Sequence, residues 1–502
     1  MSDAHVTLIL EGTYPYVAGG VSSWVHQILC AYPDRRFALM HIGSHQGAYD
    51  KPLFELPPNV TTLAEAHCRG ELATPRRATA ERPRAPGAPS RMLAAFRRIH
   101  LGEDVDDALL ADLASGDLSI GEFLHGDATF ELLRRELYER LSPDAPFMDF
   151  FWHFRAMHIP LLRLLAAPCP PAEIYHAVST GYAGVVGAIA SKRHGRPLLV
   201  TEHGLYARER EMELSRASWI KDVDTEGAIG RGRPSPLRKF WSHYFRMLSR
   251  IAYHQASRLV TLSEANHAKQ LADGADPAKT TIVPNGVDED HWRPLVPAWA
   301  RVVTPARPMR VGFVGRVVPI KDVLTLIRAC GLARDQVELE VWIVGPENED
   351  ATYAARCHAL VASLGLEEHV RFMGSQPVVD IYPQLDVVLL TSLSEGQPLV
   401  MLEAYAAGLP VIATDVGACR ELIEGGDAAD RALGPAGVCT RVANPAETAA
   451  ALVLLASQPA LRAQMGRTGA ARVTARYRLG QVVASYESFY AAMGLAPPTV
   501  SS

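Results

Sequence analysis

The chain has 502 residues, which is too long for one ordinary hydrophobic core and predicts two large domains. Hydrophobic residues make up 48% of it, charged residues 21%, and the formal net charge is -5, so nothing favours binding to nucleic acid. The seven cysteines are scattered without a C-x-x-C pair, which predicts neither a disulfide framework nor a zinc cage.

The first part of the chain alternates short apolar strands with helical stretches. Val6 to Gly12 predicts a buried strand, and a Gly-rich loop and a helix from about Val21 to Ala31 follow it. This alternation predicts an α/β domain over residues 1–289, built on a doubly wound parallel sheet. Further strands are expected at Phe37 to Ile42, Ile174 to Ala177, Leu198 to Thr201, Leu259 to Leu262 and Thr281 to Val283.

Two segments interrupt this alternation. An insertion at about 69–149 contains the Pro- and Arg-rich stretch Thr74 to Arg91, which predicts a loop, and mostly helical patterns after it. The second segment, Asp290 to Pro308, has four prolines and polar flanks, which are typical of an interdomain linker. We therefore expect the first domain to end near residue 289 and the linker to occupy 290–308.

The strand and helix alternation then restarts and predicts a second sheet over residues 309–478. A helix from about Leu479 to Met493 follows, and we expect the segment 479–502 to cross back and pack on the first domain. The strands of the second sheet are expected at Arg310 to Val314, Leu339 to Val344, Val370 to Met373, Val387 to Leu390, Val411 to Thr414 and Val438 to Thr440.

The most informative motif is the stretch TSLSEGQPLVMLE, which places two carboxylates around a helix start. Glu395 lies in the tight turn Gly396-Gln397-Pro398, and Glu403 lies about one turn into a helix predicted from Leu399 to Ala407. The amino end of this helix would point at the carboxyl edge of the sheet, where a diphosphate would be favoured. The carboxylates could accept hydrogen bonds from sugar and ribose hydroxyls, although a bare pair of acids at this spacing is more often solvated.

Two cations follow the first strand of the second domain. Arg316 and Lys321 lie between a predicted strand and a predicted helix, at the same sheet edge as Glu395. The planar guanidinium of an Arg and the compact ammonium of a Lys can bind a pyrophosphate, and they can stabilise the charge that develops as the pyrophosphate leaves. Alone, the pair would indicate only a basic turn that caps a helix.

In the first domain, Gly19 and Gly20 would allow the backbone to approach a ligand closely. The alternative interpretation is that the two glycines only form a turn. Their spacing does not fit G-x-G-x-x-G, so dinucleotide binding gains little support. His203 ends a predicted strand and could bond a sugar hydroxyl or phosphate oxygen, although a lone His is more often structural.

Several other functional signatures are missing from the sequence. A serine nucleophile triad, a Walker loop and a clustered metal-ligand motif are not found, so metal catalysis is not indicated. The first residues lack a basic segment, and no apolar run approaches the length of a membrane span. We therefore expect a cytoplasmic protein.

Together these motifs resemble glycosyltransferase family 4, the retaining enzymes of the GT-B fold, and the stretch EGTYPYVAGGVSSWVHQ resembles its PelF group. The resemblance implies two Rossmann-like domains that face a central cleft, with the donor held mainly by the second. It implies no metal, and no cofactor besides a UDP-sugar co-substrate, with UDP-glucose as the best guess. The implied catalytic residues are Glu395, Arg316, Lys321 and His203, and the implied donor-binding residues are Gly19, Gly20, Arg316, Lys321, Glu395, Gly396, Gln397, Pro398, Leu399 and Glu403.

The PelF resemblance also implies partners: a growing exopolysaccharide of the Pel type as acceptor, and inner-membrane synthase components that recruit the protein. One departure is that many family members carry Glu-Gly-Phe-Gly where this chain has Glu395-Gly396-Gln397-Pro398. Pro398 removes a backbone N–H from the ligand, so sugar selectivity is not expected to follow distant members.

Three rival functions remain open. A non-catalytic subunit that binds a nucleotide sugar for a membrane synthase would use the same polar residues. A nucleotide-sugar epimerase has a similar two-domain architecture and would also use Arg316 and Lys321. A dinucleotide-dependent dehydrogenase is weaker, because the chain lacks a fingerprint glycine triplet followed by a ribose-binding acid.

Overall fold

The computed structural model describes residues 4–49, 51–70, 89–217, 219–220, 235–292 and 307–496. The chain forms two compact units: Met1–Thr261, His267–Thr281 and Glu487–Ser502 make the first, and Leu262–Asn266 with Ile282–Tyr486 make the second. The second unit thus begins at Ile282, ahead of the expected linker. Most of the loop expected at Thr74 to Arg91, and most of the linker expected at Asp290 to Pro308, lie outside the described residues.

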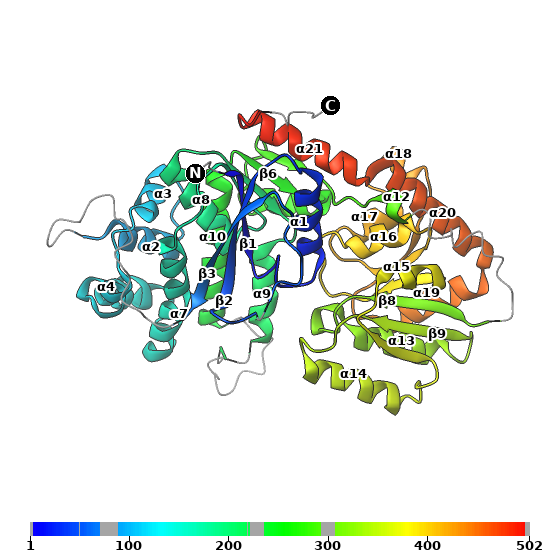
Figure 1. Cartoon of the computed structure of the whole chain (residues 1–502). Coiled ribbons are helices and arrows are strands. Elements are labelled where there is room, and N and C mark those ends of the chain that lie inside the picture. Colours follow the sequence, from blue (N-terminus) through cyan, green and yellow to red (C-terminus); the bar gives the residue numbers. More distant parts are fainter. Residues whose placement is uncertain are drawn as a thin grey trace. The chain divides into compact units, whose positions relative to one another are not determined.

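The first unit is built on a seven-stranded sheet in the order β3-β2-β1-β4-β5-β6-β7 (Figure 1). Neighbouring strands from β3 to β6 run parallel, and the order reverses between β1 and β4, as in a doubly wound fold. The strands are β1 (Ala4–Glu11), β2 (Phe37–His45), β3 (Val60–Arg69), β4 (Ala172–Ala177), β5 (Leu198–Glu202), β6 (Arg258–Thr261) and β7 (Thr280–Ile282).

Every strand expected in the first sheet is confirmed, with only its ends shifted, but β3 was not predicted. This edge strand is mostly half-exposed and carries Glu65 and His67, so it lacks the continuous apolar run of its neighbours. The helices that alternate with the strands are α1 (Gly20–Ala31), α8 (Tyr182–His194), α9 (Tyr206–Arg216), α10 (Pro236–Gln255) and α11 (Glu264–Ala272).

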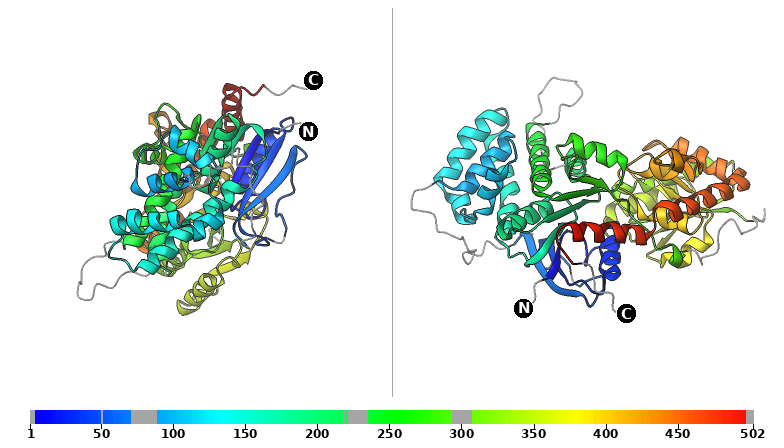
Figure 2. Two further views of the ribbon diagram at one scale, coloured as in Figure 1. Left: turned by 90° about the vertical axis from the view of Figure 1, so that its left-hand side faces the viewer. Right: turned by 90° about the horizontal axis from the view of Figure 1, so that it is seen from above.

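The insertion after β3 forms a helical layer within the first unit, coloured blue to cyan in Figure 2. It shares one hydrophobic core with the sheet helices, because Phe96, Phe154 and Phe240 belong to the same buried cluster. Its elements are α2 (Arg91–Leu101), α3 (Asp107–Ala114), α4 (Ile120–His125), α5 (Asp127–Glu131), the π-helix η1 (Leu132–Tyr138), α6 (Glu139–Leu141) and α7 (Phe147–Ala166).

The second unit has a six-stranded parallel sheet in the order β10-β9-β8-β11-β12-β13. Its central strand β11 is buried on both faces: Val387 and Leu389 join one core, and Val388 and Leu390 join the other. All six predicted strands are confirmed. They are β8 (Met309–Val314), β9 (Leu339–Val344), β10 (Val370–Gly374), β11 (Val387–Leu390), β12 (Val411–Thr414) and β13 (Gly437–Thr440).

Helices complete the second unit, and the last of them continues into the first. From Glu487 onwards this final helix, α21, belongs to the first unit, where Glu487 pairs with Arg35 and the Tyr490 hydroxyl lies 2.9 Å from His176 Nδ1. The helices are α12 (Glu289–Trp292), α13 (Val323–Ala333), α14 (Ala351–Ser363), α15 (Val378–Ile381), α16 (Leu399–Ala406), α17 (Cys419–Glu424), α18 (Ala428–Arg431), α19 (Pro445–Ser457), α20 (Pro459–Arg476) and α21 (Leu479–Ala492), with short 3-10 turns η3 (Pro319–Lys321) and η4 (Tyr382–Gln384).

Candidate functional site

Two loops of the second unit meet at its topological switch point. Strands β8 and β11 are parallel neighbours, and the chain order reverses between them. The loop 315–322 follows β8, and the loop 391–398 follows β11. Ligands of open α/β sheets bind at such a point, outside the carboxyl ends of the strands.

Hydrogen bonds to backbone carbonyls join these two loops. The Leu393 N–H donates to the Ile320 carbonyl over 2.8 Å, and the Thr391 hydroxyl donates to the Asp322 carbonyl over 2.9 Å. From the neighbouring strand β12, the Thr414 hydroxyl donates to the Ser392 carbonyl over 2.6 Å. The loops therefore hold each other in a fixed arrangement before any ligand binds.

Within this arrangement Lys321 and Glu395 form an ion pair. Lys321 Nζ lies 2.6 Å from Glu395 Oε1, and the Ser392 hydroxyl donates to the same oxygen over 2.6 Å. The side chains are 21% and 11% exposed, so the pair is accessible yet partly desolvated. Ser392 orients the carboxylate, while the flexible Lys stem lets the ammonium exchange this partner for an anionic ligand.

Arg316 does not join that pair. Its guanidinium donates to Glu349 Oε2 over 2.7 Å, and both side chains are about one-third exposed. The structure therefore brings Lys321 to Glu395, as expected of neighbouring loops, but gives Arg316 a different carboxylate partner.

The turn after Glu395 uses its polar groups mainly for structure. Gln397 is 4% exposed; its Oε1 accepts from the Asn285 N–H over 2.5 Å, and its carbonyl accepts from Asn285 Nδ2 over 2.9 Å. The Gly396 carbonyl accepts from the Ala418 N–H over 2.8 Å. Donor binding by Gln397 stays a prediction, and in this structure its side chain is buried against Asn285.

Helix α16 begins at Leu399, so Pro398 occupies the N-cap position rather than the first turn. Pro398 has extended backbone angles, and no side chain caps the helix. Its amino end thus keeps backbone N–H groups and the positive end of its dipole available to an anion.

Glu403 lies in the second turn of α16. The Tyr382 hydroxyl donates to Glu403 Oε2 over 3.0 Å. Burial raises the pKa of the Glu403 carboxyl, and the Tyr382 hydrogen bond partly offsets that rise. The second carboxylate is thus held in one orientation with its other oxygen left for a ligand hydroxyl.

Gly417 sets the position of the Glu395 turn and was not identified from the sequence. It has a φ of +53°, and a Cβ there would lie 2.1 Å from the Glu395 carbonyl oxygen and 2.3 Å from that of Gly396. Both contacts are to backbone, so a side chain would displace the turn.

We expect Gly417→Ala to lower the rate of any reaction at this site by about tenfold or more, since misplacing reacting groups is costly. Gly374→Ala is the matched control, because Gly374 has a φ of +63° and a Cβ there would meet no atom within 4 Å. Both variants carry a left-handed backbone cost of about 1–2 kcal/mol. Equal activities at equal stability would contradict the positioning role of Gly417.

In the first unit the predicted residues lie near the start of α1. Gly19 is the N-cap and Gly20 the first residue of this helix, and both are exposed. His203 follows β5, is 8% exposed and packs edge-on against Trp24 of α1, with ring centroids 4.6 Å apart. Its Nε2 has no hydrogen-bond partner among the described residues, which leaves that atom for a ligand.

Burial lowers the pKa of His203 to about 3, so its imidazole is neutral near pH 7. Because the unfolded chain takes up this proton near pH 6.5 and the folded chain does not, the free energy of unfolding should fall as the pH drops below about 6.5. We expect His203→Gln to reduce this dependence between pH 6.5 and 5.0 in urea unfolding by the contribution of one residue. Equal slopes for wild type and His203→Gln would contradict the burial of a neutral His203.

Neither a metal-binding cluster nor a membrane-spanning helix is found among the described residues. No group of three or more His, Cys, Asp or Glu side chains among them could hold a metal ion. Within the same part of the chain, no helix is both long and apolar enough to cross a membrane.

Two family models match the chain. Residues 4–278 match the domain of unknown function DUF3492, and residues 308–458 match "Glycosyl transferases group 1". The D-inositol 3-phosphate glycosyltransferase of Nocardia farcinica is 38% identical over an alignment of 184 residues that covers 34% of this chain and 40% of that protein. The MMP alpha-(1->4)-mannosyltransferase of Mycolicibacterium hassiacum is 27% identical over 61% of this chain and 67% of its own length. The chain thus spans between two fifths and two thirds of these two relatives.

Solved structures share the fold over nearly the whole chain. Anabaena Alr3699/HepE in complex with UDP superposes with a TM-score of 0.58 at 16% identity, over 97% of this chain and 100% of that one. Sucrose-phosphate synthase from Thermosynechococcus elongatus gives 0.61 at 17% identity, over 97% and 99%. The fold is thus the GT-B fold of two Rossmann-like domains. Since the first family model spans more than half of the chain, the protein belongs to the DUF3492 family and carries a glycosyl transferases group 1 domain in its second unit.

Proposed function

We propose that the protein is a retaining glycosyltransferase that moves a hexose from a UDP-sugar, with UDP-glucose as the first candidate, to a growing exopolysaccharide. The observation that carries this proposal is the Lys321–Glu395 pair at the switch point of the second sheet. At one sheet edge, the cation suits the diphosphate of a sugar nucleotide and the oriented carboxylate suits the hydroxyls of its sugar.

The donor would be held by groups of the second unit. The amino end of α16 and Lys321 would bind the diphosphate, with Arg316 able to join by leaving Glu349. Glu395 would orient the sugar and Glu403 would accept the ribose hydroxyls. The choice of UDP is supported by solved structures of the same fold, in which Anabaena Alr3699/HepE is in complex with UDP and with UDP-glucose.

Catalysis would rest on positioning and on electrostatic stabilisation of the leaving diphosphate. Charge that develops on the diphosphate would be stabilised by the Lys321 ammonium and by the helix dipole, so this route needs no divalent metal. By family analogy, the acceptor attacks from the face that the leaving group vacates, and a donor phosphate oxygen helps to remove its proton.

The acceptor and partners are proposed from the sequence resemblance to the PelF group. We propose a Pel-type polysaccharide as acceptor, a cytoplasmic location, and recruitment to the inner membrane by synthase components. The amino-terminal stretch with Gly19 and Gly20, which begins α1, supports this assignment.

A panel of UDP-, GDP- and ADP-sugars tests the proposal by calorimetric binding and by release of free nucleotide. We expect one UDP-sugar to bind and to release UDP, and we expect Glu395→Ala to abolish release without abolishing binding. Glu349→Ala is a matched control, because Glu349 also pairs with a site cation but is more exposed. Tight binding with no release from wild type, even with acceptors, would instead favour the non-catalytic binding subunit.

A further inference from the structure

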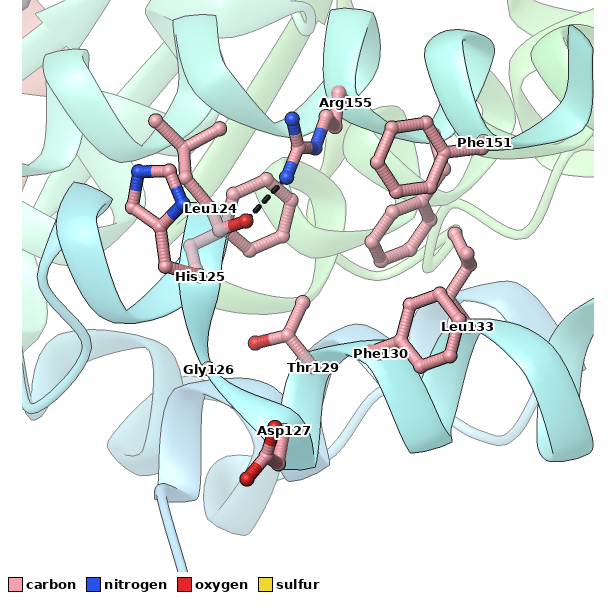
Figure 3. A pocket seen from close by; sticks show the side chains of 11 residues that line it. Leu124, His125, Gly126, Asp127, Thr129, Phe130, Leu133, Phe151 and Arg155 are labelled. Atoms are coloured by element: carbon pink, nitrogen blue, oxygen red, sulfur yellow. Dashed lines mark hydrogen bonds between the residues drawn. The ribbon is translucent and has the colours of Figure 1, made fainter. Parts of the chain in front are cut away.

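A pocket of about 270 Å³ lies in the helical insertion of the first unit, apart from the residues assigned to the donor (Figure 3). It lies among α4, α5, η1 and α7. This volume is near the lower end of small-ligand sites, which begin at about 300 Å³, so it suits a single ring. Its lining residues are Phe123, Leu124, His125, Gly126, Asp127, Thr129, Phe130, Leu133, Phe151, Phe154 and Arg155.

Aromatic rings form much of the pocket wall. Phe123 and Phe154 are buried and stacked, with ring centroids 5.5 Å apart. At the opening, Phe130 is 44% exposed although it is a large hydrophobic side chain. Nearby on α7, Trp152 is 58% exposed. A hollow lined by hydrophobic and aromatic side chains is typical of a small-ligand site.

Polar groups lie among these rings. The Arg155 guanidinium donates to the Leu124 carbonyl and stacks 4.3 Å from the centroid of the Phe151 ring. No ion pair among the described residues includes Arg155, so most of its five N–H donors remain for a ligand. Figure 3 shows the Thr129 side chain between Arg155 and Asp127, and Asp127 supplies a carboxylate at the rim.

The backbone around the pocket is also unusual. Leu133 belongs to η1, a π-helix of seven residues that continues directly from α5. π-Helical segments are rare and are frequently found at functional sites. Here Leu133 of η1 lines the pocket and belongs to the same buried core cluster as Leu132 and Leu137.

We propose that this pocket binds one pyranose ring of a saccharide chain, and so holds part of the acceptor polysaccharide on the first unit. A pyranose presents an apolar C–H face, which aromatic rings attract, and a rim of hydroxyls that both donate and accept hydrogen bonds. The pocket offers both kinds of surface: Phe rings on its walls, and Arg155 donors with Asp127 and Thr129 acceptors. Trp152 would receive the next ring of the chain. The inference rests on the proposed polysaccharide-building function.

Calorimetry of the full chain with hexasaccharides of α-1,4-glucose, β-1,4-glucose and N-acetylglucosamine tests this proposal, with no nucleotide sugar present. We expect at least one hexasaccharide to bind, and we expect Phe130→Ala and Arg155→Gln each to weaken binding about tenfold. The controls are Leu141→Ala and Arg135→Gln, which change exposed residues of the same helical layer outside the pocket lining. Both controls should bind as wild type does.

Saturation-transfer NMR on wild type gives a second readout that needs no variant, and should transfer magnetisation from aromatic protons to sugar C–H protons. Absence of binding by all three hexasaccharides, or equal affinities in pocket and control variants, would overturn the proposal. The proposal would also be overturned if an anilinonaphthalene sulfonate dye bound in the pocket and saccharide did not displace it. Donor binding by the same variants, measured by calorimetry without acceptor, should equal that of wild type, which separates a failure of the pocket from a failure of the transferase assignment.

Discussion

Replacing Lys321 with Met should lower the rate of nucleotide release at saturating donor by about a hundredfold, because in the proposed mechanism the leaving diphosphate would lose a cation that stabilises it. Lys321 lies 2.6 Å from Glu395 and is 21% exposed, so it is held at the site yet reaches a ligand. Steady-state kinetics with the preferred donor measure this effect. We expect the loss mainly in kcat, since the charge on the diphosphate grows as the bond to the sugar breaks.

The control for this variant is Arg328→Met, which removes a cation from the exposed face of the helix that follows Lys321. It should leave kcat and KM unchanged. Lys321→Arg should retain part of the rate because the charge is kept in a different geometry. A Lys321→Met protein that is folded, binds donor and turns over at the wild-type rate would exclude Lys321 from leaving-group stabilisation.

Replacing Arg472 with Met should lower the free energy of unfolding by about 3–5 kcal/mol, because it leaves a buried carboxylate and several carbonyls without their partner. The Arg472 side chain is 0% exposed, and its Nε donates to Asp430 Oδ1 over 2.6 Å. Its remaining four N–H groups donate to carbonyl oxygens, so all five donors are used. These acceptors are the carbonyls of Leu422, Ile423, Asp430 and Gly434.

Arg476→Met is the matched control, one turn further along α20. Arg476 pairs with Asp427 over 2.8 Å and only loosely, over 3.8 Å, with the buried Asp430. Its side chain is 33% exposed, so removing it should cost about 0–1 kcal/mol. Urea unfolding followed by circular dichroism compares the two variants with wild type. Similar losses for both would show that the buried network around Arg472 does not stabilise the second unit more than a surface pair does.

The sheets were predictable because their strands are buried on both faces and are therefore continuously apolar. Val387 to Leu390 is the clearest case, since alternate residues of this strand enter different cores. The edge strand β3 was missed for the opposite reason: its polar, half-exposed residues break the apolar run. The helices of the insertion were recognised as helical patterns, but the pocket that they form depends on packing between them.

The candidate site was predictable in part. The parallel-sheet rule was enough to bring the loops of Lys321 and Glu395 to one edge, because strand neighbours follow from the doubly wound order. It could not give the partner of Arg316, since Glu349 comes from the loop after β9 and side-chain pairing depends on loop conformation. Nor could it show that Gln397 is buried against Asn285, 112 positions earlier in the chain.

Ser392 and Gly417 carried weaker signals. Ser392 lies within the recognised TSLSEGQPLVMLE stretch, but a serine in a loop has many uses, and only its 2.6 Å bond to Glu395 gives it a role. Gly417 lies in a turn after β12, where glycine is common in many proteins. Its role in positioning the Glu395 turn appears only from its closeness to the Glu395 carbonyl. Ser392 acts within its own loop, three positions from Glu395, whereas Gly417 acts through its closeness to a different loop.

The central claim, that a sugar is transferred, is tested most directly by following labelled glucose from UDP-glucose into an oligosaccharide acceptor, with and without inner-membrane vesicles. The account predicts a saccharide lengthened by one labelled residue, with one UDP released for each sugar transferred, and predicts that Glu395→Ala makes neither. Label recovered in an isomerised UDP-sugar without acceptor would identify an epimerase instead. If UDP-glucose stays bound and intact, and no labelled saccharide forms under either condition, sugar transfer is contradicted. The protein would then be interpreted as a nucleotide-sugar-binding subunit.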